Sequence, residues 1–296
     1  MPITKREGAE TVLSGFHFVE GPRWHEGQLW FSDMHGHRVM RSSLDGKAEV
    51  VVEIEDDHPS GLGWLADGRL LVVTMATRQL RRVEPDGSVV VHADLSGIAR
   101  GDCNDMISRP DGTAWVGDMA YDVHGGSHAT QAGQTIVVTP DGRARSAADD
   151  LVAPNGHVLS EDGRTLIVAE SGGFRLTAFD VGEDGSLSNR RTFAELTPEP
   201  GFEYAPPDGI CLDAEGAVWV AVPIARRFYR VREGGEITDW IRPADEANAI
   251  ACVLGGPDRR TLLMAVSQSL PGPHELPAGN ARIDALRVEV PGAGAP

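Results

Sequence analysis

Cysteine, cationic side chains and long apolar runs are all scarce in this chain of 296 residues. Its three cysteines, Cys103, Cys211 and Cys252, are odd in number and lack CxxC spacing, which argues against a disulfide framework. We expect free, buried thiols in a reducing compartment, with a catalytic Cys103 as the alternative. The first residues lack the apolar stretch of a signal peptide, and no run reaches the roughly 18 apolar residues of a membrane span. These features predict a cytoplasmic protein.

Positive charge is scarce because 27 Lys and Arg residues face 44 Asp and Glu residues, for a formal net charge of −17. Such a balance argues against nucleic acid and anionic membranes, since a protein that binds them must neutralise phosphate. It is typical of a solvated acidic surface with a modest attraction for cations. We expect a small-molecule partner, and a monomer or a small homo-oligomer.

The chain does have an internal repeat of six copies. Each copy has a short β-type run, an acidic residue at a turn and a second apolar run, as in 60–73 and 208–220. The first residue of a copy, here called the lead residue, stands seven before the turn acid in five copies and one fewer in the first. Equivalent residues of a repeat occupy equivalent places. The lead residues, which should therefore gather around one axis, are Glu20, Ser60, Asn104, Asn155, Asp208 and Ala251.

The lead residues are 40, 44, 51, 53 and 43 residues apart (20 to 60, 60 to 104, 104 to 155, 155 to 208 and 208 to 251). Periods of about 40 to 50 residues with strand signals indicate propeller blades. In the first copy, four strand-like runs are separated by Glu-Gly and Asp-Gly turns. No long segment has helical periodicity. The sequence predicts an all-β fold, a six-bladed β-propeller with four antiparallel strands per blade, as one domain over residues 1–296.

The ring must also close. The last copy supplies three strands, at Cys252–Leu254, Thr261–Ser267 and Ile283–Val290, and Glu10–Leu13 is the natural fourth. Pairing the two ends of the chain would remove two exposed strand edges. Three segments exceed a hairpin turn, and we expect lids or entrance loops on one face. They are 122–134, 196–207 and 269–280.

Three lead residues, Glu20, Asn155 and Asp208, offer only oxygen ligands. Hard divalent cations prefer such ligands, so we expect one metal ion on the axis, with Ca²⁺ preferred and Zn²⁺, Mn²⁺ or Mg²⁺ as alternatives. Asn104, with Asp105 beside it, adds a further polar group at the equivalent place. The alternative is that Glu-Gly, Asn-Gly and Asp-Gly are turn dipeptides. The turn acids have their own position seven residues later, which favours the metal site.

Other motifs are weak. We interpret most histidines, among them His25, His35, His37, His58, His124 and His128, as loop or surface residues, and His157 as a packing residue that could line the channel. Neither a GxSxG motif nor a Gly-rich phosphate loop occurs, so a serine triad and a nucleotide cofactor are disfavoured.

At these residues the chain resembles the family of senescence marker protein (regucalcin), gluconolactonase and luciferin-regenerating enzyme. The resemblance covers nearly the whole chain, and the motifs that carry it are Glu20-Gly-Pro, Asn104-Asp105, Pro154-Asn155-Gly156, the 186–191 segment SLSNRR and the 207–216 segment PDGICLDAEG. It implies a six-bladed propeller with one divalent metal in its channel. It also implies Glu20, Asn155 and Asp208 as the ligands, with Asn104 contacting water or substrate, and lactone hydrolysis as the activity.

Two departures concern the substrate. Sugar-lactonase members of that family carry Arg two residues before the Asn-Asp pair, where this chain has Asp102. They carry Glu two residues after the Met of a Gly-Thr-Met motif, where this chain has Tyr121, and Asp118 replaces the Thr. We therefore place Asn104, Asp102 and Tyr121 in the substrate site, and gluconolactone as the substrate is not implied.

These observations lead us to expect metal-assisted hydrolysis of a lactone or small ester. The cation would polarise the carbonyl, and a carboxylate would take a proton from the attacking water. Asp208 is the first candidate for that base, Asp105 the second and a hydroxide held by the cation the third. The alternatives are a non-catalytic calcium-binding or interaction propeller, and a related propeller hydrolase or C–C bond-forming enzyme.

Overall fold

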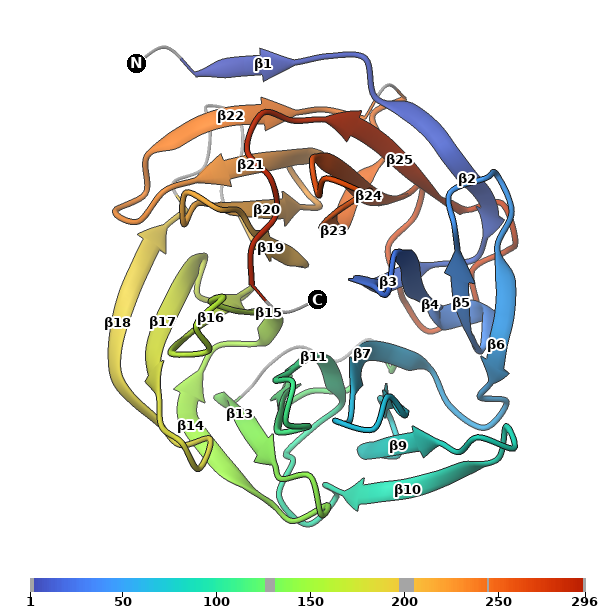
Figure 1. Ribbon diagram of the computed structural model, residues 1–296, viewed down its shortest axis with the longest axis vertical. Coiled ribbons are helices and arrows are strands. Elements are labelled where there is room, and N and C mark those ends of the chain that lie inside the picture. Colours follow the sequence, from blue (N-terminus) through green and yellow to red (C-terminus); the bar gives the residue numbers. More distant parts are fainter. Residues whose placement is uncertain (1–2, 126–130, 197–204, 244, 295–296) are drawn as a thin grey trace.

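In the computed structural model, six β-sheets stand around one centre like the blades of a propeller (Figure 1). The structure describes residues 3–125, 131–196, 205–243 and 245–294. In blades 1 to 4 the strands are antiparallel and follow one another in chain order, and in blades 1 to 5 a tight Asp-Gly or Glu-Gly turn connects the first two strands. The glycine of the inner turn has a positive φ in five blades, at Gly27, Gly68, Gly112, Gly163 and Gly216. The predicted six-bladed propeller with four antiparallel strands per blade is confirmed.

The first three blades have the same plan. Blade 1 contains β3 (Val19–His25), β4 (Gln28–Asp33), β5 (Arg38–Ser42) and β6 (Glu49–Glu53), with the 3₁₀ turn η1 (Met34–Gly36) after β4. Blade 2 contains β7 (Pro59–Trp64), β8 (Leu70–Thr74), β9 (Gln79–Val83) and β10 (Val89–Asp94). Blade 3 contains β11 (Cys103–Ser108), β12 (Ala114–Asp118), β13 (Gly133–Val138) and β14 (Ala144–Leu151).

The other three blades include the two that involve the N-terminus. Blade 4 contains β15 (Pro154–Leu159), β16 (Thr165–Glu170), β17 (Arg175–Val181) and β18 (Leu187–Glu195). Blade 5 contains β19 (Ile210–Leu212), β20 (Val218–Val222), β21 (Arg227–Val231), β22 (Ile237–Ile241) and β1 (Thr4–Arg6). Blade 6 contains β23 (Asn248–Gly255), β24 (Thr261–Ser267), β25 (Ala281–Arg287) and β2 (Glu10–Phe16).

The ring is closed by the N-terminal segment, as the sequence predicts. Strand β2 pairs antiparallel with β25 and forms the outer strand of blade 6. Strand β1 was not expected: it adds a fifth strand to blade 5, parallel to β22 (Figure 1). An ion pair between Arg6 and Asp239, 2.6 Å apart, fixes it there. Its three residues, TKR, have no apolar alternation that could have indicated a strand.

The hydrophobic core is divided among the interfaces between blades. Six clusters of buried side chains occur in the described residues, and each joins two neighbouring blades. Trp115 and Leu166, for example, are fully buried between blades 3 and 4. Both faces of the middle strands are therefore apolar, and fully burying one such aliphatic or aromatic side chain contributes about 1.5–3 kcal/mol. No helix among the described residues is long and apolar enough to cross a bilayer.

The C-terminal segment closes one end of the central channel. Strand β25 ends at Arg287, three residues before the predicted end, because the chain then turns towards the centre of the ring (Figure 1). There Gly292 forms a bridge with Asp213, and the N–H of Ala293 donates to the Leu212 carbonyl at 3.0 Å. Leu212 is the last residue of the inner strand β19. The segment therefore covers the end of the channel at which the inner strands finish, and a cavity of only about 20 Å³ remains beside it.

Candidate functional site

The polar lead residues lie at the opposite end of the channel, where the inner strands begin. Glu20 and Asn155 are the second residues of β3 and β15, Asn104 is the second residue of β11, and Asp208 comes just before β19. Adjacent inner strands contact one another around the ring. The side chains of Asn155 and Asp208 are hydrogen-bonded to each other, and the carboxylate of Glu20 is within electrostatic range of that of Asp208. The three predicted metal ligands thus come together from blades 1, 4 and 5.

The glycine after four of the lead residues is required by packing and not by a turn. A Cβ at Gly21 would lie 2.7 Å from the Ser60 carbonyl oxygen, and one at Gly156 would lie 2.6 Å from that of Asp208. Gly61 and Gly209 meet the backbone of the next blade in the same way. These glycines allow neighbouring inner strands to approach each other closely. The interpretation of these pairs as turn dipeptides is therefore wrong.

A β-bulge follows the lead position in most inner strands. The register of pairing shifts between Glu20 and Arg23 in β3, between Pro154 and His157 in β15, and at the equivalent places in β7 and β11. A bulge locally interrupts the alternation of side chains and changes the direction of one of them. It therefore allows a polar side chain to face the axis at the start of a strand whose later residues are apolar.

The electrostatics of Glu20 and Asp208 favour a bound cation. Burial, followed by the nearby carboxylates of Asp208 and Asp105, raises the pKa of Glu20 well above its usual value. Burial also raises the pKa of Asp208 to about 8, and Asp105 adds to that shift against the hydrogen bond from Asn155. Two carboxylates in one buried place repel each other unless a proton or a cation lies between them.

Two oxygens of this group lack partners. The Oδ1 atoms of Asn155 and Asp208 are buried and accept no hydrogen bond from the described residues. An unpaired buried polar atom is unfavourable, and such atoms in a native protein call for a ligand. Two carboxylates and an amide carbonyl are the ligands that Ca²⁺, Mg²⁺ and Mn²⁺ prefer. The residues present fit a divalent cation.

Asp105 lies on the same axis, but its carboxylate already has partners. Its Oδ1 accepts from the Arg23 guanidinium at 2.6 Å, and its Oδ2 accepts from the His157 backbone N–H at 3.2 Å. Arg23 also donates to the carbonyl of Met106, and both members of the ion pair are buried. Asp105 occupies the position at which four other blades have glycine, so its side chain fills the channel below the lead residues.

His157 has a packing role, as the sequence analysis favoured. Its Nδ1–H donates to the Asn155 carbonyl at 2.6 Å, and its Nε2 accepts from the Thr135 hydroxyl at 3.1 Å. Burial lowers the pKa of His157 to about 4, so the ring is neutral in this arrangement. The hydrogen bond to the backbone of residue 155 fixes the strand that carries one of the candidate ligands.

Three further candidate residues lie around the lead positions. Asn104 is buried, and its Oδ1 accepts from the Ser60 hydroxyl at 2.6 Å, which leaves the Nδ2 group with only a weak contact to the Met119 sulfur. Asp102 accepts from the Val123 backbone N–H, and burial raises its pKa to about 6. Burial, Asp208 and Asp102 together raise the pKa of Tyr121 to about 12, which places Tyr121 near both carboxylates.

Five polar residues that the sequence analysis did not connect lie together at the same end of the molecule. They are His35, His37, His58, His124 and Glu275. His35 lies in a connection between strands, as expected of most histidines, but its side chain is fully buried and not on the surface. The local signal that could have indicated the group is the His-Gly-His spacing of residues 35 to 37. His128 lies outside the described residues.

The cysteines are free and buried, as expected. Burial raises the pKa of the Cys103 thiol far above its usual value, so the thiolate that a nucleophile needs is disfavoured. The Sγ atoms of Cys211 and Cys252 are 3.6 Å apart in the interface between blades 5 and 6.

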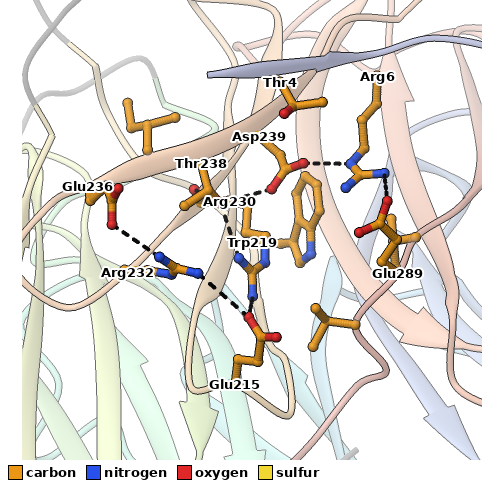
Figure 2. Close-up of a pocket in the computed structure, with 13 residues that line it drawn as sticks. Thr4, Arg6, Glu215, Trp219, Arg230, Arg232, Glu236, Thr238, Asp239 and Glu289 are labelled. Carbon is orange, nitrogen blue, oxygen red and sulfur yellow. Dashed lines mark hydrogen bonds and ion pairs between the residues drawn. The ribbon is translucent and has the colours of Figure 1, made fainter. Parts of the chain in front are cut away.

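A separate pocket of about 410 Å³ lies between β1, β22 and the C-terminal segment (Figure 2). Its arginines are each paired with carboxylates: Arg6 with Asp239 and Glu289, Arg230 with Glu215, and Arg232 with Glu236. Figure 2 shows these side chains pointing towards one another around Trp219. Since the charges compensate each other, we assign the pocket to the attachment of β1.

Comparisons with known proteins agree with this geometry. The model of the SMP-30/Gluconolactonase/LRE-like region matches residues 18–268. Regucalcin of Xenopus laevis is 29% identical over 256 residues, which cover 84% of this chain and 83% of that protein. A luciferin-regenerating enzyme has a TM-score of 0.81 at 22% identity, with 97% of this chain and 98% of that chain covered. A gluconolactonase from Xanthomonas campestris has a TM-score of 0.70 at 24% identity, with 95% and 88% covered. The chain belongs to the SMP-30/gluconolactonase/LRE-like family.

Proposed function

We propose that this protein is a divalent-metal-dependent hydrolase that opens a lactone or a related small ester. The observation that carries the proposal is the group of Glu20, Asn155 and Asp208 at the open end of the channel, with two buried oxygens that have no partner among the described residues. Membership of a family whose description includes gluconolactonase supports a lactone as the substrate class.

Glu20, Asn155 and Asp208 would hold the cation, which as a Lewis acid would polarise a substrate carbonyl and stabilise developing negative charge there. Asp208 is the residue we assign as general base, because its carboxylate retains an oxygen without a hydrogen bond from the described residues. It accepts a proton from the attacking water and returns it to the ring oxygen as the C–O bond breaks. The product is a hydroxy acid.

Asp105 is less suited to be the base, because Arg23 and the His157 N–H already bind its two oxygens. We assign to it the positioning of β15 and the compensation of Arg23. Asn104 has its carbonyl oxygen directed at Ser60, so its Nδ2 group is the part that could donate to a substrate oxygen. Because Asn104 occupies the lead position equivalent to those of the proposed ligands, this donor would lie beside the reacting carbonyl.

Asp102 and Tyr121 would contact the part of the substrate away from the carbonyl. Val123 N–H binds one oxygen of Asp102, and the Tyr121 phenol lies within electrostatic range of Asp102 and Asp208. A carboxylate and a phenol present an acceptor and a donor to substrate hydroxyl groups. The pair repels anionic substrates, so a neutral lactone with hydroxyl or amide substituents suits it best.

A cation-binding propeller without catalysis is the second candidate, since an oxygen-only ligand set is also that of a calcium site. The two functions can be distinguished because only the hydrolase would turn over a lactone or ester. A panel of lactones of different ring sizes, followed by proton release, should be hydrolysed by the metal-loaded protein. Activity should disappear on chelation and return with one of Ca²⁺, Mg²⁺, Mn²⁺ or Zn²⁺. Binding of the cation without hydrolysis of any lactone or ester would favour the second candidate.

Asp208→Asn should reduce kcat by at least about a hundredfold, because general base catalysis alone contributes about 10²–10⁴. Asp141→Asn is the matched control: it removes the same charge at an exposed outer turn and should leave turnover unchanged. The metal content of both variants must be measured. Normal turnover by Asp208→Asn with its cation bound would exclude Asp208 as the base.

A further inference from the structure

The histidine group lies at the open end of the channel but shares no residue with the axial site. His35 belongs to η1, His58 stands two residues before Ser60, and Glu275 belongs to the segment between β24 and β25. His124 comes from the segment after β12. In an antiparallel blade, these connections all lie at the end where the inner strand begins. The group therefore joins blades 1, 2, 3 and 6 at the rim of the channel.

The carboxylate of Glu275 stands among three imidazole rings. Its Oε2 lies 2.7 Å from His35 Nδ1, and its Oε1 lies 2.9 Å from His58 Nε2 and 3.5 Å from His37 Nε2. The backbone N–H of Leu276 also approaches His35 Nδ1, at 3.2 Å. One ligand atom from each of His35, His58 and Glu275 can be chosen so that all three lie within 4.8 Å of one another.

The tautomer of His37 suits a cation in this group. Its Nδ1 lies 2.8 Å from the Asp57 carbonyl oxygen, so Nδ1 carries the proton and donates. In the neutral ring Nε2 then presents a lone pair to the carboxylate of Glu275. A carbonyl partner on the far nitrogen is also how proteins orient imidazoles that bind metals.

The other rings of the group pack closely and leave ring nitrogens unpaired. His124 stacks on His58 with ring centroids 3.8 Å apart. His35 Nε2 and both ring nitrogens of His124 are buried without a hydrogen bond from the described part of the chain. Neutral imidazoles with unused nitrogens are the form that binds transition metals.

We propose that His35, His58 and Glu275 form a second metal site, selective for Zn²⁺ or a transition metal of similar preference, with His37 and His124 at its edge. Two imidazoles and a carboxylate form a recognised zinc ligand set with an open fourth position. Tetrahedral bonds of about 2.0–2.1 Å require ligand atoms about 3.3 Å apart. The present contacts of 2.7 and 2.9 Å would have to open by about half an ångström. Glu275 can allow this, because its side chain is 54% exposed.

Such an ion would tie the segment between β24 and β25 to the neighbouring blades 1 and 2. The segment would then form a fixed part of the entrance to the axial site. The two sites would also differ in metal preference, since the axial ligands are all oxygens and the rim ligands are mainly nitrogens. Because of that difference, Zn²⁺ binding at the rim site can be measured while Ca²⁺ occupies the axial site.

The experiment is a Zn²⁺ titration of the chelated, intact protein in a large excess of Ca²⁺, which occupies the axial oxygens. We expect one Zn²⁺ per chain and a visible absorption band typical of tetrahedral nitrogen–oxygen coordination when Co²⁺ replaces Zn²⁺. Glu275→Gln should bind Zn²⁺ at least tenfold more weakly, because even second-shell changes cost about 10–100-fold. His274→Gln is the matched control, an exposed histidine one residue away, and should bind as the wild type does.

His58→Ala should also lose Zn²⁺ binding at this site. If that variant does not fold, Glu275→Gln still tests the proposal, because Glu275 is exposed. The proposal is overturned if Ca²⁺-saturated protein binds no Zn²⁺. It is equally overturned if Glu275→Gln and the wild type bind Zn²⁺ with the same affinity. Neither result bears on lactone hydrolysis, because the axial residues are unchanged in these variants.

Discussion

Replacing Gly209 with alanine tests whether the close approach of the inner strands determines the shape of the axial site. The added Cβ would lie 2.6 Å from the Cα of Ala251 and closer still to its Cβ. Carbon atoms in contact are normally about 3.5–4.0 Å apart. The two strands must therefore separate by roughly an ångström, since the atoms in the way belong to backbone and Cβ and cannot rotate aside.

Overpacking of this kind costs about 1–3 kcal/mol and occasionally more. We expect Gly209→Ala to lower the free energy of unfolding in urea by at least this amount. Because Asp208 precedes the substituted residue, the variant should also bind the axial cation more weakly. The two readouts together distinguish a displaced strand from a general loss of stability.

Gly97→Ala is the control for this experiment. Gly97 lies in an exposed turn, a Cβ there would meet nothing within 4 Å, and its φ is not in the left-handed region. Its replacement should be neutral or stabilise the protein by about 0.4–1 kcal/mol through the unfolded chain. If Gly209→Ala unfolded at the same urea concentration as Gly97→Ala, the inner strands could not be packed as closely as described.

Two further predictions concern charges on the axis. Burial raises the pKa of Asp208 to about 8, so below that pH a proton competes with the cation for its carboxylate. If binding displaces one proton, the apparent affinity of the axial site for the cation should fall about 50-fold from pH 8 to pH 6. Calorimetry at several pH values would show this, and an affinity independent of pH would contradict it. Arg23→Met leaves the buried carboxylate of Asp105 without its partner and should cost about 3–5 kcal/mol. The double variant Arg23→Met, Asp105→Asn should recover part of the lost free energy of unfolding, measured in urea. An Arg23→Met variant as stable as the wild type would refute the argument.

The repeat made most of the fold predictable. The turn acids and the apolar runs between them give the number of blades and the order of strands without any long-range information. The closing strand could be predicted because the last copy supplies only three of the four strands that a blade needs. Strand β1 could not be predicted in this way, because Arg6 and Asp239 are far apart in sequence and their ion pair is a property of the folded chain.

The candidate site was predictable to the extent that it follows the repeat. Equivalent positions in different blades share one height on the axis, so Glu20, Asn155 and Asp208 could be placed together from their register alone. The partners of Asp105 and Asn104 could not be predicted. Arg23 and Ser60 reach them across blade interfaces, and the choice of partner depends on bulges and side-chain directions that the repeat does not encode.

The histidine group shows the limit of that reasoning most clearly. Its members lie in connections of different length, outside the repeated strands, and no common register relates His58 to Glu275. Only the His35-Gly-His37 pair is local in the sequence, and its spacing was overlooked there. A group assembled from loops of several blades becomes visible only when the ring is closed.

The fold separates the residues that stabilise it from those that can carry chemistry. The apolar clusters that hold the blades together lie between the sheets, and of the six lead residues only Ala251 belongs to one of them. The side chain at a lead position can therefore vary, as Ser60 and Ala251 differ from Glu20 and Asp208, without removing the contacts that hold the ring. The same holds for the rim, where His58 and Glu275 add no buried apolar surface. If the proposed sites are correct, the axial residues would determine which cation and which carbonyl chemistry are possible, and the rim would determine which molecules reach them.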